Sequence, residues 1–213
     1  QIVLDSNKHY PVKTLSGNTI TGKSAAKKNV DRFCDILAEE LAKYPEDLLR
    51  KVTLERIVLS RTLKRDGTTY GGFAEYDSDT IHFDVTEGWD LEGFMKAKVH
   101  HELFHFIDYR DDLTIDKDES WEKLNAADFK YDSKKSGFGG LDDTQKGFLN
   151  TYSQTGVGED KAEIYGYLVG HPKGIAARIR KDGVIERKAG RMKELVRNYC
   201  ASLDNAFWES LRD

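Results

Sequence analysis

Apolar positions along the chain alternate between a helical period and a strand period, and this pattern divides the first third into predicted elements. Over residues 24–44, apolar side chains recur at helical spacing, which predicts a helix that Pro45 ends. Residues 54–63 are rich in Ile, Val and Leu and predict a strand. Residues 1–22 are mixed and carry turn signals rather than a clear period.

Two further strands are predicted next, and together they form a hairpin. Tyr70–Tyr76 and Thr80–Val85 are rich in aromatic and β-branched residues, and the Asp77–Asp79 segment between them is a turn signal. Gly71 and Gly72 thin the first of these strands, which suits an edge or a close approach by another backbone. We therefore expect a small mixed sheet with an antiparallel edge strand.

A mostly apolar helix is predicted from Leu91 to about Tyr109, with Asp90 as its N-cap. Its apolar residues surround much of the circumference instead of forming one stripe, which is typical of a buried helix. We expect this helix to be central and the small sheet to pack on it.

The rest of the chain is mostly helical. Residues 110–150 are polar and loop-rich, with a short helix expected over Glu119–Ala127. Helical periodicity returns over Gly158–Gly170, and two more helices are expected over Arg187–Leu203 and Asn205–Leu211. Strands first and helices later indicate an α+β fold.

The length of 213 residues suits one domain with a sizeable core. We expect a single domain over 1–213, with an N-terminal lobe over 1–109 that holds the sheet and the central helix. Residues 110–213 would form a helical C-terminal lobe. Within it, residues 133–143 contain the glycine-rich Ser136–Gly140 and are either a lid or a plain surface loop.

The charge balance is slightly acidic, with 33 Lys and Arg against 37 Asp and Glu and a net charge of −4. Binding to nucleic acid needs a basic surface, so we expect no nucleic-acid partner. The sequence has no apolar run near the roughly 20 residues that a membrane-spanning helix needs, so we expect no membrane span. We expect a monomer.

The first residue and the cysteines bear on the compartment. Because the sequence begins with Gln1 and not Met, we expect a secreted or cell-envelope protein from which a signal segment has been removed. Cys34 and Cys200 lack the spacing of metal ligands or of a redox pair. They are either two core thiols or one long-range disulfide in an oxidising compartment.

The central helix contains the sequence His101-Glu102-Leu103-Phe104-His105. Positions four apart share one helix face, so the two imidazoles can bind one metal ion. Glu102 lies beside that face, where it can take a proton from a water molecule at the metal without being a ligand. Burying three ionisable groups on an apolar helix is expensive unless they are paired or bound to metal, which favours a catalytic metal site.

A tetrahedral catalytic zinc needs a third protein ligand and one open position. Asp111, ten residues after His101, is one candidate and corresponds to the metzincin layout. That layout needs a Gly where Asp108 stands and a later Met turn, whereas Met192 lies in a helical stretch.

Glu159 is the second candidate for the third ligand. Glu159 and Glu163 are four residues apart and face the same way on a predicted helix. One carboxylate can bind zinc while the other receives the N–H of a ligating histidine and fixes its ring. Two acidic residues in a first helical turn, favoured by the helix dipole, are the structural alternative.

The chain resembles the gluzincin zinc metallopeptidases, in particular the catalytic domain that anthrax lethal factor shares with the Pro-Pro endopeptidases. The common pattern is HExxH, then several dozen residues, then Tyr, six residues and Glu-x-x-Ala-Glu. Here it is formed by His101–His105, Tyr152 and the Glu159–Glu163 segment. That family usually has aromatic residues where this chain has Asp160 and Lys161.

The resemblance implies a zincin-like fold and a set of site residues. It implies that Zn²⁺ is bound by His101, His105 and Glu159. Glu102 would be the general base, and Tyr152 would face the substrate carbonyl.

Two more roles follow from the same resemblance. Glu163 would receive the N–H of a ligating histidine. The edge strand of such enzymes pairs with an extended peptide, and here that strand is Tyr70–Tyr76, with Gly72, Phe73 and Ala74 at the substrate.

The sequence therefore predicts a zinc-dependent endopeptidase that acts on a peptide or protein substrate. Two alternatives stay open: a non-catalytic peptide- or protein-binding module with a structural zinc site, and a peptidase domain that serves as an effector or toxin fragment. Glu102 and Tyr152 favour catalysis over the binding module, because a structural zinc site needs no base.

Overall fold

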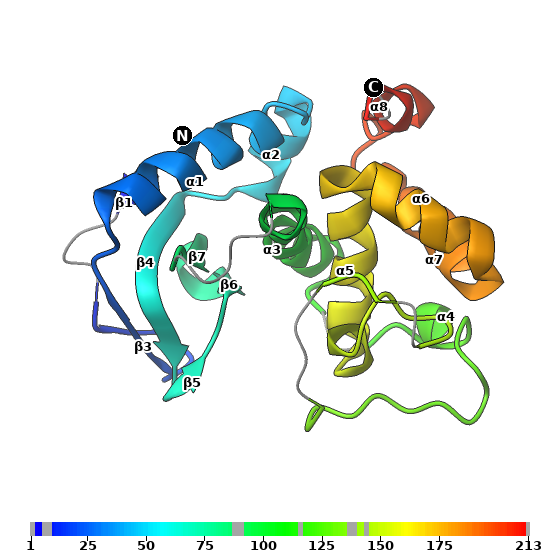
Figure 1. The fold of residues 1–213 in the computed structure, drawn as a ribbon, viewed down its shortest axis with the longest axis horizontal. Coiled ribbons are helices and arrows are strands. Elements are labelled where there is room, and N and C mark those ends of the chain that lie inside the picture. The colour runs from blue at the N-terminus through cyan, green and yellow to red at the C-terminus, as the bar shows by residue number, and fades with distance from the viewer. Residues whose placement is uncertain are drawn as a thin grey trace. The chain divides into compact units, whose positions relative to one another are not determined.

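The computed structural model describes residues 3–5, 10–86, 92–114, 117–135, 140–142 and 145–211. The chain divides into two compact units, Gln1–Met95 and Lys96–Asp213 (Figure 1). The first holds the sheet and two helices, and the second is helical. The α+β class and the small mixed sheet expected from the sequence are confirmed. The single domain with lobes at 1–109 and 110–213 stays a prediction, as does the packing of the sheet on the central helix.

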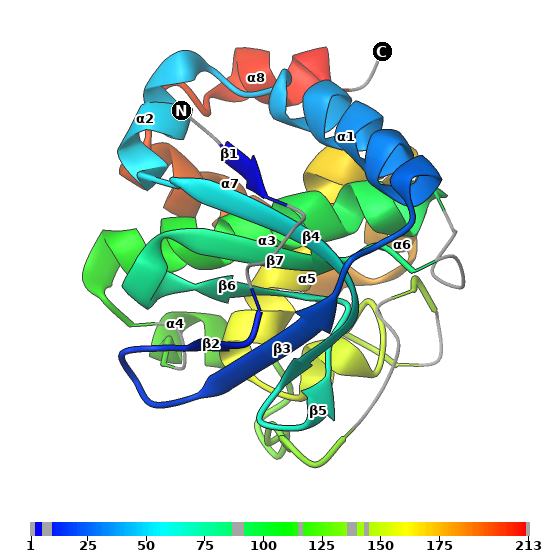
Figure 2. The ribbon, with the colours of Figure 1, turned by 90° about the vertical axis from the view of Figure 1, so that its left-hand side faces the viewer.

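The sheet of the first unit is built around one long strand, β4 (Arg56–Arg65). Figure 2 shows β4, β7 and β6 side by side. β4 pairs in parallel with β7 and β1, whereas its pairs with β3 and β5 are antiparallel. The other strands are β1 (Val3–Asp5), β2 (Val12–Lys13), β3 (Thr19–Lys23), β5 (Thr68–Thr69), β6 (Gly72–Glu75) and β7 (Thr80–Asp84), in the order β2-β3-β4-β7-β6.

The predicted hairpin is confirmed. β6 runs antiparallel to β7, with Phe73 opposite His82, and it is the last strand in the order of the described sheet. The short 3₁₀ helix η1 (Tyr76–Ser78) connects the two strands, and Asp79 takes the left-handed conformation with φ 48°. Asp tolerates that conformation better than most residues, which explains why the turn falls there.

Two helices accompany the sheet within the first unit. α1 (Lys27–Leu41) packs on it through Phe33, whose ring centroid lies 4.9 Å from that of Phe83. α1 ends at Leu41, three residues before the predicted end at residue 44, and Pro45 is the N-cap of a further helix, α2 (Glu46–Val52), which the sequence analysis did not predict.

The second unit begins at Lys96, within α3 (Glu92–Asp112), the predicted central helix. Every residue from 97 to 107 is buried, which confirms the expectation of a buried helix. Its expected N-cap, Asp90, and its expected first residue, Leu91, lie outside the described residues.

In the part of the chain that the structure describes, six short or medium elements follow α3. The helix predicted over 158–170 is confirmed, and the one predicted over 119–127 ends five residues early. An unpredicted helix begins at Pro172, because proline fits the first turn of a helix as well as it ends one. These elements are α4 (Glu119–Glu122), η3 (Tyr152–Gln154), α5 (Val157–Gly170), α6 (Pro172–Lys181), α7 (Gly183–Tyr199) and α8 (Asn205–Ser210).

The structure also bears on the expectations for the cysteines, a membrane span and the candidate lid. Cys34 and Cys200 are not joined in a disulfide, so the core-thiol alternative holds. Among the helices of the described residues, none combines the length and the apolarity needed to cross a bilayer. Of the candidate lid, residues 136–139 and 143 lie outside the described part of the chain.

A fully buried ion pair fixes α5 against α7. Asp160 and Lys188 are both 0% exposed, and their Oδ2 and Nζ atoms are 2.6 Å apart. Asp160 Oδ2 also accepts hydrogen bonds from the Trp121 indole and the Tyr131 hydroxyl, and Lys188 donates to the carbonyl oxygen of Gly147. Several polar partners thus hold each charge in place. Because the pair is buried, removal of one member leaves the other in the core without its main counter-charge.

We predict that Lys188→Met lowers the free energy of unfolding by about 3–5 kcal/mol, because it leaves the Asp160 carboxylate buried without its counter-charge. Urea unfolding monitored by circular dichroism measures this loss. In the double variant Lys188→Met/Asp160→Asn the loss is smaller than the sum of the two single losses. Additive losses would contradict a coupled pair.

Candidate metal centre

Helix α3 presents two imidazoles on one buried face. His101 and His105 are four residues apart, and their rings lie edge-to-face with centroids 4.8 Å apart. They are 6% and 8% exposed, and Glu102 between them is 4% exposed. Ligand atoms of these three residues all lie within 4.8 Å of one another, so this buried group could hold a metal ion.

Helix α5 lies at very close range to α3, and the contacts between the two helices run in opposite order along their sequences. A Cβ atom added at Gly166 would lie 2.7 Å from the carbonyl oxygen of Ala97, and one at Gly170 would lie 2.5 Å from the Ala97 amide nitrogen. Only glycine fits at such distances. Sequence reasoning missed this pair, although two small residues four apart on one helix face are a recognisable signal for close packing.

The close approach brings Glu159 to the two histidines. Its Oε2 lies 3.1 Å from His101 Nε2 and 3.5 Å from His105 Nε2, and the two imidazole nitrogens are 3.2 Å apart. The three atoms form a nearly equilateral triangle. The Glu159 side chain is 29% exposed, but its Oε2 atom, which faces the imidazoles, is buried.

The triangle matches the size of a zinc site. Ligands about 2.0–2.1 Å from a tetrahedral zinc ion are separated from each other by about 3.3–3.4 Å. The observed separations of 3.1, 3.2 and 3.5 Å bracket that value. Two imidazoles and one carboxylate are also donors that Zn²⁺ accepts. The residues therefore fit the ion that the sequence motif implies.

A second carboxylate contacts the far side of the His101 ring. Glu163 Oε1 lies 2.9 Å from His101 Nδ1, and Glu163 Oε2 accepts a hydrogen bond from the side-chain amide of Asn150. Glu163 is 5% exposed and Asn150 is 0% exposed. Sequence reasoning identified Glu163 but missed Asn150, because an isolated Asn in a loop carries no spacing signal.

The electrostatics separate the carboxylates of the site into two kinds. Burial raises the pKa of Glu102, and the nearby imidazoles only partly oppose it. For Glu159 the effect of burial is outweighed by His105 and His101, which hold its pKa far below the ordinary range.

The His101 imidazole responds to these carboxylates. Burial disfavours its charged form, but hydrogen bonds to Glu159 and Glu163 outweigh burial and raise its pKa well above the ordinary value. The site is therefore rich in negative charge, which suits a cation.

Tyr152 belongs to the same cluster. It lies in η3, and its ring centroid is 6.0 Å from that of His101. Burial raises the pKa of the phenol well above its ordinary value, and the charges of nearby carboxylates and a hydrogen bond with Glu159 add to the rise. The phenol therefore stays protonated and can donate a hydrogen bond into the site.

The remaining residues singled out in the sequence lie elsewhere. α3 continues to residue 112 without the turn at 108 that the metzincin layout needs, and Asp111 is exposed in its last turn. Asp108 instead pairs with Lys161 at 2.6 Å. Gly72, Phe73 and Ala74 lie on the edge strand β6 of the first unit.

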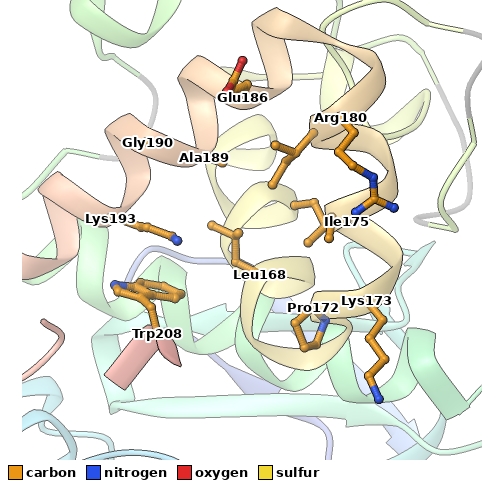
Figure 3. Close-up of a pocket in the computed structure, with 12 residues that line it drawn as sticks. Leu168, Pro172, Lys173, Ile175, Arg180, Glu186, Ala189, Gly190, Lys193 and Trp208 are labelled. Atoms are coloured by element: carbon orange, nitrogen blue, oxygen red, sulfur yellow. The ribbon is translucent and has the colours of Figure 1, made fainter. Parts of the chain in front are cut away.

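A pocket of about 450 Å³ lies between α5, α6, α7 and α8 (Figure 3). Its walls include the apolar side chains of Leu168, Ile175 and Trp208. The residues of the His-Glu-His cluster are not among those that line it. This pocket is therefore not the candidate metal centre.

Comparison with known proteins agrees with the fold. No family model and no curated protein matches the sequence. The solved structure of a "putative zinc-binding metallo-peptidase" from Bacteroides caccae is similar, with a TM-score of 0.63 over 99% of this chain and 83% of that chain. The two sequences are 15% identical, so the similarity shows a metallopeptidase-like fold.

We predict that Gly166→Ala lowers the free energy of unfolding by about 1–3 kcal/mol, because the added methyl group overlaps the backbone of α3. The matched control is Gly190→Ala in α7, where an added Cβ meets nothing within 4 Å. In that control the free energy of unfolding rises by about 0.5–1 kcal/mol, since alanine has a higher helix propensity than glycine. Urea unfolding of both variants tests the difference in sign, and an equal effect would contradict close packing at Gly166.

Proposed function

We propose that the chain is a zinc-dependent endopeptidase of the gluzincin type. The observation that carries the proposal is the buried triangle of His101, His105 and Glu159 donor atoms, which has the size of a zinc site. The metallopeptidase-like fold of the solved neighbour supports it.

Each residue of the cluster has a role in this proposal. A zinc ion held by His101, His105 and Glu159 would supply Lewis-acid chemistry, polarising a peptide carbonyl and acidifying a water molecule. Glu102 accepts the proton of the attacking water and passes it to the leaving amine. Its pKa, raised by burial, favours that role, because an effective base has a pKa near the working pH.

Tyr152 is proposed to donate a hydrogen bond to the oxygen that becomes negative as the carbonyl is attacked. The phenol lies among three carboxylates that keep it protonated, and it is held near His101 on its own 3₁₀ turn. A preorganised donor acts more strongly on the transition state than on the substrate, because charge develops there.

The substrate is proposed to be an extended peptide that adds a strand to β6. Gly72, Phe73 and Ala74 belong to this strand, which pairs on one side with β7 and ends the order of the described sheet. Backbone pairing gives such complexes affinity, and alternate side chains give them selectivity.

Matched glutamate variants distinguish the proposed ligand from the proposed base. We predict that Glu102→Gln retains one zinc per chain and loses peptidase activity, because it keeps the ligand triangle and removes the proton acceptor. Glu159→Gln, the same chemical change, weakens zinc binding because it removes the charge of a ligand. Metal analysis after dialysis and digestion of a peptide library give the two readouts. Full cleavage by Glu102→Gln would refute the assignment of the base.

We also predict that Tyr152→Phe keeps the zinc content and lowers kcat by about 100- to 1,000-fold, as expected for loss of one transition-state donor. KM changes little, because the phenol acts on charge that the bound substrate lacks. Steady-state kinetics with a peptide identified in the library measure both constants. A rise in KM alone, with kcat unchanged, would place the phenol in substrate binding instead.

A further inference from the structure

Asn150 closes a tight turn just before η3. Its Oδ1 accepts a hydrogen bond from the Ser153 amide at 2.9 Å, and its carbonyl oxygen accepts one from the Ser153 hydroxyl at 2.8 Å. The backbone amide of Asn150 in turn donates to the Ser153 hydroxyl at 3.2 Å. Both residues are 0% exposed, so the turn is a fixed part of the core.

Tyr152 lies inside this turn, directly before Ser153. The backbone continues as η3, with the Thr155 amide and hydroxyl donating to the Tyr152 carbonyl oxygen. The position of the phenol therefore follows from the turn that Asn150 and Ser153 hold on one side and Thr155 on the other.

The other end of the Asn150 side chain contacts the histidine side of the site. Its Nδ2 donates to Glu163 Oε2, while Glu163 Oε1 lies 2.9 Å from His101 Nδ1. One amide group thus connects the Tyr152 turn to the carboxylate that faces the His101 ring.

We propose that Asn150 is a positioning residue that couples the orientation of the His101 imidazole to the placement of the Tyr152 phenol. This inference rests on the proposed function and adds a residue to it. An amide suits the position because it offers an acceptor to Ser153 and a donor to Glu163 at once. An aspartate would keep the acceptor but set a second carboxylate against Glu163.

The test is Asn150→Asp, which keeps the acceptor for the Ser153 amide but replaces the donor to Glu163 by a second carboxylate. We expect zinc affinity, measured by competition with a chromogenic chelator, to fall about 10-fold, and kcat to fall about 10- to 100-fold. KM changes little, whereas the free energy of unfolding falls, because the new carboxylate is buried next to Glu163. The direction of the change in zinc affinity is informative. An added negative charge near the site would by itself strengthen the binding of a dication. Weaker zinc binding therefore reports the lost orientation of His101.

Two further variants complete the experiment. Asn198→Asp adds the same charge on an exposed position of α7 and leaves zinc affinity and kcat unchanged. Ser153→Ala removes the hydroxyl that hydrogen-bonds with the backbone of Asn150 and so loosens the turn that carries Tyr152. We expect it to lower kcat while zinc affinity stays as in the wild type. This variant tests the coupling even where Asn150→Asp fails to fold.

The outcomes separate the inference from the proposed function. Wild-type zinc affinity and kcat in Asn150→Asp, or wild-type kcat in Ser153→Ala, would overturn the role of Asn150 while the peptidase assignment stands. A wild-type protein that binds no zinc and cleaves no peptide would overturn the proposed function, and the inference with it.

Discussion

The site depends on the close contact between α3 and α5. Gly166 and Gly170 let the backbone of α5 approach Ala97 of α3 at distances that no Cβ atom permits. Those contacts lie at the start of α3 and the end of α5, whereas Glu159 at the start of α5 meets His101 and His105 further along α3. Glu163 lies between them in sequence, 2.9 Å from His101 Nδ1. A wider separation of the helices by even an ångström or so would part these carboxylates from the imidazoles, since hydrogen bonds tolerate only a few tenths of an ångström.

Three successive charged residues at the start of α5 keep that contact in register. Successive positions on an α-helix are turned by about 100°, so Glu159, Asp160 and Lys161 point in three directions. Glu159 reaches the histidines, Asp160 pairs with Lys188 of α7, and Lys161 pairs with Asp108 of α3. The charged residues at positions 160 and 161 thus anchor α5 through buried ion pairs. Such pairs fix geometry more than they add stability, because desolvation offsets most of their attraction.

Local patterns predicted much of the fold and the part of the site that lies on one element. The His101–His105 spacing places both imidazoles on one face whatever the tertiary structure, and the strands of the hairpin follow from their composition and turn. α2 and α6 were missed because each proline was interpreted as the end of the preceding helix, whereas Pro45 and Pro172 stand at the start of the next one. Asn150 was missed for a different reason. Its role depends on what another segment presents to it, and that information exists only in the folded chain.

Glu102 and Glu159 show how one residue type can acquire two chemistries within a single cluster. Both lie within reach of His101 and His105, yet the imidazoles outweigh burial at Glu159 and burial prevails at Glu102. A carboxylate that stays ionised is suited to hold a cation, and one whose proton affinity is raised is suited to take and return a proton. Titratable neighbours whose pKa values are driven apart are a recurrent sign of divided acid–base roles. The difference comes from placement: Glu159 meets both nitrogens from the opposite helix, while Glu102 is fixed beside them by the helix that carries them.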